Sequence, residues 1–121
     1  ARERSTFGKP LINNQVIKHK LVEMNRCVRA SKAWTELLSW RVMNGESPIA
    51  DLAMLKVQAS KTMELCAREA MQILGGAGYL RGNSGPARVE RIYREVRVNA
   101  IGGGSEEIMY DLASRQLGYK A

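Results

Sequence analysis

Two glycine-rich turns hold the residue types in this sequence that are best suited to binding chemistry. Residues 72–79, Gln-Ile-Leu-Gly-Gly-Ala-Gly-Tyr, end a helix-patterned run, and residues 101–108, Ile-Gly-Gly-Gly-Ser-Glu-Glu-Ile, lead into another. Glycine is unfavourable unless the backbone must turn left-handed or lie close to a ligand. Two such turns in a small, otherwise helical chain therefore indicate surfaces where bare main chain meets a bulky ligand.

Each turn also has a simpler interpretation. A helix C-cap followed by a loop accounts for residues 72–79 taken alone, and a dinucleotide fingerprint is excluded there because the glycines follow a helix instead of a strand. Before the last helix, free backbone N–H groups and the helix dipole can hold an anion such as a pyrophosphate. Glu106 and Glu107 already bring negative charge to that helix end, so a self-capped helix fits the second turn equally well.

A third candidate is a series of arginines at every third position, Arg88, Arg91, Arg94 and Arg97. Glu90 and Glu95 lie at helical pairing distance from them, so the pattern favours a solvated, salt-bridged helix face. Contact of one or two arginines with a phosphate or a partner subunit is the alternative. Nucleic-acid binding normally combines basic side chains with aromatic ones, and only Tyr93 lies among these arginines.

Other chemistries have little support. His19, the single histidine, stands between two lysines and is expected to be a solvated helix residue, which argues against His-based zinc sites and Ser-His-Asp catalysis. Cys27 and Cys66 lack metal-ligand spacing and are expected to be reduced core thiols, which suit a reducing compartment. Glu106 and Glu107 are adjacent, so they point in different directions from a helix and form no catalytic carboxylate pair.

Composition sets the broad limits. The 121 residues are 45% apolar, which is ordinary for one globular domain, and the net charge of +7 favours phosphate-bearing partners. No apolar stretch is long enough to span a membrane, and no secretory or transit pattern opens the chain. The chain begins Ala1-Arg2 without an initiator methionine, which predicts a piece excised from a larger protein. The cytoplasm or the mitochondrial matrix is favoured over secretion.

The elements that position these residues are expected to be helices alone. Apolar residues recur at helical spacing, and no run alternates with period two for long enough to predict a strand. The fold class is therefore all-α, an antiparallel four-helix bundle. The expected helices run from Pro10 to Asn44-Gly45, from Pro48 (capped by Ser47) to Gly75, from Pro86 to about Arg97, and from Ser105 as N-cap to Gln116, with residues 81–86 as a loop and Gly118 as the final stop.

The second of these helices is expected to have one apolar seam along its whole length. The residues of that seam are Ile49, Leu52, Leu55, Ala59, Met63, Cys66, Ala70 and Ile73. Small residues, among them Ser60 and Ala67, predict a close approach of a neighbouring helix to this one.

Five segments, taken together and in this order, resemble the C-terminal helical domain of flavin-dependent acyl-CoA dehydrogenases. They are Arg4-x-Thr6-Phe7-Gly8, Gln15, Gln72-Ile73-Leu74-Gly75-Gly76-Ala77-Gly78-Tyr79, Arg94-Glu95 and Gly104-Ser105-x-Glu107-Ile108. Each segment is weak alone, but five with family-like spacing are specific, and they span essentially the whole chain.

The resemblance implies an architecture and a function. In that family this domain is a four-helix bundle that packs against an N-terminal helical domain and a middle β-domain. Residues 1–121 would then be the single C-terminal domain of a larger three-domain flavoenzyme. Such enzymes form dimers or tetramers, bind FAD across a subunit interface, and dehydrogenate acyl-CoA thioesters between the α- and β-carbons. Electrons pass to an acceptor such as an electron-transfer flavoprotein, and nucleic acid is not a ligand.

The resemblance also implies contacts residue by residue. FAD contacts from one subunit would be Arg4 and Thr6, with Asn14 and Gln15 nearby. The adenosine and diphosphate of a neighbouring subunit's FAD would lie along Gln72, Ile73, Leu74, Gly75 and Gly76. At the last helix, Ser105, Glu106 and Glu107 would meet FAD, and Gly104 would border the acyl-CoA thioester. No metal ligand is implied.

One position departs from the family pattern in a way that matters for catalysis. Many members carry the glutamate base immediately before the Gly-Thr that reads Gly104-Ser105 here, and this sequence has Gly103 there. Glycine cannot act as a base. The long-chain and isovaleryl types also lack a base here and supply it from another helix, upstream of this segment. Either the base lies outside residues 1–121, or the parent is a divergent homologue with different chemistry. The family's Arg-Asp pair also reads Arg94-Glu95 here.

These observations leave two function classes. The first is the FAD-binding and oligomerisation domain of an acyl-CoA dehydrogenase, which alone would have no dehydrogenase activity. The second is a helical interaction module that binds nucleic acid or a protein partner through its arginine-rich face.

Overall fold

The computed structural model describes residues 1–82 and 87–119, and its described part is mainly helical. A short hairpin of β1 (Ser5–Thr6) and β2 (Lys9–Pro10) and a 3-10 turn, η1 (Leu11–Asn13), precede the helices. The helices are α1 (Gln15–Met43), α2 (Ile49–Leu74), α3 (Gly76–Tyr79), α4 (Ala87–Ile101) and α5 (Glu106–Gln116). The prediction of an all-α domain with four main helices is confirmed. The hairpin and the single-turn helix α3 were not predicted.

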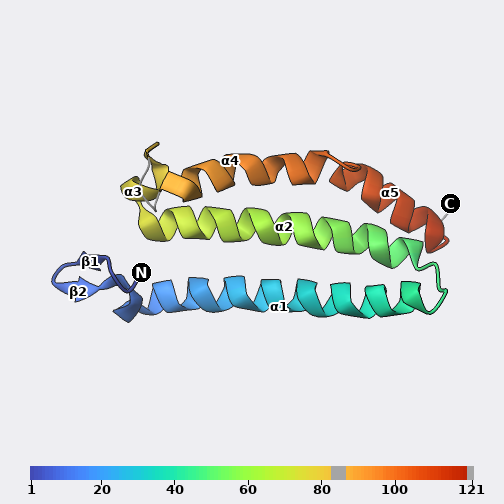
Figure 1. The fold of residues 1–121 in the computed structure, drawn as a ribbon, viewed down its shortest axis with the longest axis horizontal. Coiled ribbons are helices and arrows are strands. Elements are labelled where there is room, and N and C mark those ends of the chain that lie inside the picture. The colour runs from blue at the N-terminus through green and yellow to red at the C-terminus, as the bar shows by residue number, and fades with distance from the viewer. Residues whose placement is uncertain (83–86, 120–121) are drawn as a thin grey trace.

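The main helices form three layers with α2 in the middle (Figure 1). Helices α1 and α2 run antiparallel side by side, and α4 and α5 follow each other along the opposite side of α2. Each outer layer therefore packs mainly against α2, and the molecule is flat. This arrangement places the N-terminal hairpin and the α2–α3 turn at one end, and the α4–α5 turn partway along α2.

Because α2 has neighbours on two sides, it buries two faces, and the single predicted seam is wrong. Ser60 is only 2% exposed and its hydroxyl donates to Asn99 O of α4 at 3.1 Å. On the other side, the buried Thr62 faces α1. Between these two faces lies the predicted stripe, of which Leu52 and Met63 are exposed. The predicted close helix approach at Ser60 is confirmed.

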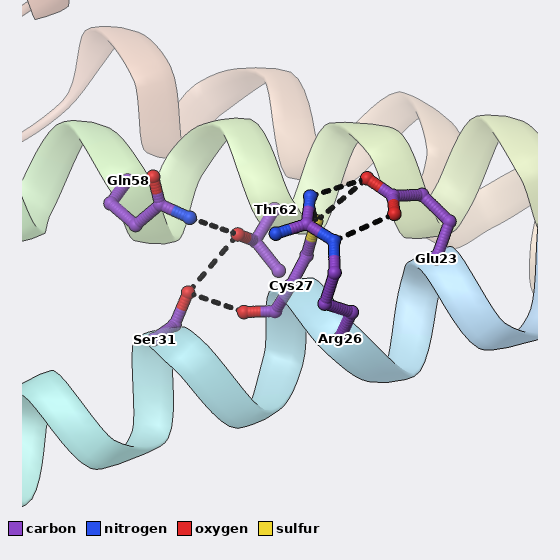
Figure 2. Close-up of polar contacts among 6 residues, drawn as sticks. All are labelled: Glu23, Arg26, Cys27, Ser31, Gln58 and Thr62. Carbon is purple, nitrogen blue, oxygen red and sulfur yellow. Dashed lines mark hydrogen bonds and ion pairs between the residues drawn. The ribbon is translucent and has the colours of Figure 1, made fainter.

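The side of α2 that faces α1 is joined to it by polar contacts (Figure 2). Ser31 of α1 donates to Cys27 O at 2.9 Å, so its single proton is used and the Thr62 hydroxyl donates to Ser31 Oγ, 3.1 Å away. Gln58 in turn donates to Thr62 Oγ1 at 3.3 Å. This chain of hydrogen bonds satisfies a buried hydroxyl and fixes the register of the two helices.

Several helices begin or end at the residues that the cap and turn patterns predicted, and other helix ends differ from the prediction. Gly45 has φ of +83° and ends α1 as expected, but α1 begins at Gln15 because residues 11–13 form a 3-10 turn. Pro48, not Ser47, is the N-cap of α2, and Ser47 makes no side-chain cap. The third main helix continues to Ile101. The expected loop at 81–86 and the start at Pro86 fall largely outside the described residues.

The flat arrangement leaves large apolar side chains in solvent. On α1, Trp40 is 60% exposed and Met43 is 85% exposed. Ile101 and Ile108, on either side of the α4–α5 turn, are also more than half exposed. Among the described residues no helix is both long and apolar enough to cross a bilayer.

Candidate functional site

Arg4 joins the N-terminal hairpin to the end of α2. Its Nη1 donates to Ile73 O at 3.1 Å and also to Leu74 O. The last carbonyls of a helix have no partner within the helix and carry the negative end of its dipole. The Arg4 guanidinium therefore caps α2, and it brings the first and third segments of the sequence-based site together in space.

The three glycines at this end have three different roles. Gly75 has φ of +58° and ψ of −142°, which glycine alone adopts easily, and a Cβ there would lie 2.8 Å from Arg4 Nη1. Gly78 is buried, and its Cβ would lie 2.8 Å from Leu74 Cβ. Gly76 is exposed with nothing within 4 Å of a Cβ. Only Gly76 therefore leaves bare backbone open to a ligand.

Residues 76–79 form a helical turn, α3, where the cap-and-loop interpretation placed a loop. The pattern could not reveal it because glycine is a poor helix former. Here the missing side chain lets Gly78 pack directly on α2. The cap itself, at Gly75, is as predicted.

At the tip of the hairpin, Phe7 and Gly8 both have positive φ, +52° and +75°. This is the geometry of a two-residue turn that favours Asn-Gly, so phenylalanine is unfavourable at the first position. Phe7 is nevertheless fully exposed and contributes nothing to the core. Thr6 is half-buried beside it, and Asn14 and Gln15 are exposed at the start of α1.

The second glycine turn lies between α4 and α5. Gly103 and Gly104 have φ of +67° and +101°. Gly103 has open space around it, whereas a Cβ on Gly104 would overlap the end of the Met109 side chain. Lys56 Nζ of α2 donates to Gly104 O at 2.5 Å. Lys56 was not among the sequence-based candidates, because nothing in its local pattern distinguishes it from a solvated lysine.

The N-terminus of α5 is capped by its own residues. Ser105 Oγ accepts from Ile108 N at 3.5 Å, as predicted for an N-cap. Hydrogen bonds from its own N–H and from Ser105 lower the pKa of Glu107, and the charges of Arg97 and Lys56 lower it further. Self-capping, one of the two open interpretations, is therefore present, and it opposes a second anion at the same N–H groups.

Glu106 is different from Glu107. Its Oε1 is buried and has no hydrogen-bond partner within residues 1–82 and 87–119. Lys61 Nζ lies 3.9 Å from the other carboxylate oxygen, at the edge of ion-pair range. A buried carboxylate oxygen without a donor is unfavourable, so this atom suits a hydroxyl or N–H group brought by a bound molecule.

The two groups of candidate residues do not share one pocket in this chain. Arg4, Thr6 and residues 72–76 lie at one end, and residues 104–107 lie beyond the far end of α4 (Figure 1). Helix α4 has 15 residues, so the two groups are about 22 Å apart along its axis. Contacts to one cofactor from both groups would require an extended molecule or a second copy of the chain.

A groove of about 720 Å³ between α2 and α4 is lined by none of the residues assigned to FAD. Its walls are Lys61, Glu64, Leu65, Arg68, Tyr93, Arg94, Val96 and Arg97. Three of the four arginines of α4 are paired: Arg91 with Glu95 at 2.7 Å, Arg94 with Glu90 at 3.6 Å, and Arg97 with Glu64 at 2.8 Å. The predicted salt-bridged face is confirmed, and its positive charge is largely balanced.

The single histidine and the two cysteines lie in environments that give them no reactive role. His19 is exposed, and Cys27 and Cys66 are free thiols, buried and half-buried. Burial, and the neighbouring Cys27, raise the pKa of the Cys66 thiol, which opposes formation of a reactive thiolate. Among the described residues no cluster of three or more His, Cys, Asp or Glu could hold a metal ion.

Comparison with known proteins decides the family. The family model for the acyl-CoA dehydrogenase C-terminal domain matches residues 1–118. The chain belongs to this family. Acyl-CoA dehydrogenase AFT10-1 of Alternaria alternata is 40% identical over an alignment that covers 93% of this chain and 28% of the relative.

Solved structures of acyl-CoA dehydrogenases agree with the fold. The crystal structure of a probable acyl CoA dehydrogenase from Mycobacterium abscessus matches with a TM-score of 0.91 and 41% identity, over 98% of this chain and 30% of that one. A glutaryl-coenzyme A dehydrogenase in complex with glutaryl-CoA matches with a TM-score of 0.82 and 30% identity, over 98% of this chain and 30% of that one. The chain thus spans about 30% of the length of these relatives.

Proposed function

We propose that this chain is the FAD-binding and oligomerisation domain of an acyl-CoA dehydrogenase that oxidises the α,β-bond of an acyl-CoA thioester. The observation that carries the proposal is the match of nearly the whole chain to acyl-CoA dehydrogenases, at up to 41% identity. The segment alone has no dehydrogenase activity, because it is one domain of the intact enzyme.

Flavin suits the residues present at both ends. Gly76 offers open backbone, Arg4 brings a cation to the same turn, and Gln72 is exposed on the last turn of α2. At the other end, Glu106 Oε1 is a buried acceptor without a donor among the described residues. When bound, FAD would supply the acceptor for a hydride that leaves the β-carbon of the substrate.

The residues proposed to hold FAD are those that the family pattern assigns. One set comprises Arg4, Thr6, Asn14 and Gln15, a second comprises Gln72, Ile73, Leu74, Gly75 and Gly76, and a third comprises Ser105, Glu106 and Glu107. The second set is proposed to contact the FAD of another subunit, an arrangement that fits its separation of about 22 Å from the third set along α4. A homo-oligomer, a dimer or a tetramer, is part of the proposal for that reason.

This domain contributes no proton-abstracting residue of its own at the usual place. Gly103 has no side chain, and its left-handed backbone disfavours any other residue there. Gly104 beside it is proposed to border the thioester. The base is therefore expected in the remaining part of the intact protein, and the electron acceptor is expected to be an electron-transfer flavoprotein.

The test is to purify the full-length protein and record its visible spectrum. Bound flavin and reduction of that flavin by an acyl-CoA support the proposal. A matched pair of variants, Gly76→Leu and Gly82→Leu, then tests the site, since both glycines have open surroundings and neither has positive φ. Loss of flavin is expected in Gly76→Leu alone. Colourless protein with salt-sensitive RNA binding would instead identify the arginine-rich face as the functional surface.

A further inference from the structure

The turn between α4 and α5 cannot hold one conformation by itself. Gly103 and Gly104 have φ of +67° and +101°, and glycine visits many other backbone conformations with little cost. A Cβ added to Gly103 would meet nothing within 4 Å, so no packed side chain restricts that position. Contacts from residues outside the turn therefore help to order it.

Two such contacts come from different helices and meet at Gly104. The Met109 side chain of α5 occupies the space where a Cβ of residue 104 would lie, and its sulfur is 3.5 Å from that position. Lys56 Nζ of α2 donates to Gly104 O at 2.5 Å. Gly104 is thus held between an apolar side chain and an ammonium group.

Lys56 is placed for this by the close packing of α2 on α4. Ser60 is one turn further along α2, and its small side chain lets the helices approach closely, with its one hydroxyl proton shared between Lys56 O, at 3.0 Å, and Asn99 O, at 3.1 Å. Ala100, which follows Asn99, is 3% exposed. The end of α4 is therefore fixed against α2, and Lys56 reaches the turn that leaves it.

The ammonium group also acts on the electrostatics of the turn. Lys56 is half-buried, so its charge is screened less than that of an exposed lysine. A donor on Gly104 O polarises the peptide unit that it shares with Ser105, which makes the Ser105 N–H a stronger donor. Lys56 thus influences both the position of the turn and the binding strength of its backbone.

We propose that Lys56 is a positioning residue for the flavin and thioester site: it holds Gly104 from α2 and polarises the Gly104–Ser105 peptide. The identity of the bound groups rests on the proposed function above. The mechanical part of the proposal, that Lys56 orders residues 102–107, does not depend on it.

The experiment compares Lys56→Met, Lys56→Arg and Lys61→Met in the full-length protein. Lys61 is the matched control because it lies on the same helix and contacts α5 through Tyr110 Oη, at 2.7 Å, and through Glu106, at 3.9 Å, without a hydrogen bond to Gly104. Hydrogen exchange of the backbone amides of residues 102–107 is measured first, without added flavin. Loss of a charged hydrogen bond is expected to speed exchange by about 10- to 100-fold in Lys56→Met. At residues 102–105, Lys61→Met is expected to match the wild type, and Lys56→Arg is expected to restore most of the protection.

Flavin binding provides the second readout. The dissociation constant of FAD is expected to rise by about tenfold in Lys56→Met and to recover in Lys56→Arg. If amide exchange in Lys56→Met equals that of the wild type, or if exchange in Lys61→Met rises by as much as in Lys56→Met, Lys56 does not position the turn. If the wild-type protein protects these amides but binds no flavin, the proposed function is wrong, while the role of Lys56 in ordering the turn still holds. If Lys56→Met does not fold, Lys56→Gln, which keeps a neutral donor, replaces it in the same comparison.

Discussion

Gly75→Ala is the substitution that tests most directly how the N-terminal hairpin is attached to α2. The new methyl group meets two obstacles. Residue 75 has φ of +58° and ψ of −142°, a conformation that is strained for any residue with a side chain. The methyl would also lie 2.8 Å from Arg4 Nη1, which is bound to the carbonyls of Ile73 and Leu74.

The expected cost is the sum of these effects. Backbone strain of this kind costs about 1–3 kcal/mol, and the loss of a hydrogen bond to a charged group costs about 1.5–3 kcal/mol. Gly75→Ala should therefore lower the free energy of unfolding by roughly 2.5–6 kcal/mol. That is a large part of the about 5–15 kcal/mol typical of a folded protein.

The assay is urea unfolding followed by circular dichroism, on a double-mutant cycle with Arg4→Ala. If the methyl displaces Arg4, the two substitutions share one loss, and their combined effect is smaller than their sum by about 1.5–3 kcal/mol. Gly76→Ala is the control, because Gly76 has open space and lies in a helical turn, so it should change stability by less than about 1 kcal/mol. Additive effects in the cycle, or a neutral Gly75→Ala, would refute this account of Arg4 as the cap of α2.

Three further substitutions have expected outcomes that the same unfolding assay can check. Glu69 is buried against Lys20 and Arg68, and the Lys20 hydrogen bond lowers its pKa from 4.5. The pair therefore stabilises the fold above about pH 4.5 and is lost as the pH falls through the lowered pKa, so acid should destabilise the wild type more than Glu69→Gln. Ser60→Leu should cost about 1–3 kcal/mol or more by overpacking the α2–α4 contact, and a neutral result would contradict the close approach there. Phe7→Asn should stabilise by up to about 1–2 kcal/mol, because asparagine tolerates positive φ better, and equal stability would show that the turn is unstrained.

Much of the fold follows from short-range signals. The Asn44-Gly45 pair and Ser105 mark helix ends because their chemistry is local: a left-handed residue ends one helix, and a hydroxyl caps another. The salt-bridged face of α4 was likewise predictable, since i to i+4 pairs depend only on helix geometry.

The features that the sequence could not reveal depend on contacts with residues that are distant in the sequence. The buried faces of α2 are set by helices on two sides, so one periodic stripe predicted the wrong residues, and Leu52 is exposed while Ser60 is buried. Arg4 and Lys56 make contacts at sequence separations of 69 and 48 residues, and no local pattern marks a lysine that reaches a distant carbonyl. The family resemblance located the turns, while the side chains that hold them are seen only in three dimensions.

The flat, three-layer packing around α2 has a thermodynamic consequence. A compact monomer of 13.5 kDa is expected to expose about 6,500 Å², whereas this chain exposes 8596 Å². The excess of about 2,000 Å² is more than twice what one partner contributes to a standard protein interface. Exposed Trp40 and Met43 are part of that surface. The cooperative unit of unfolding should therefore be larger than this domain, and its midpoint in isolation should lie well below its midpoint in an assembly that covers these faces.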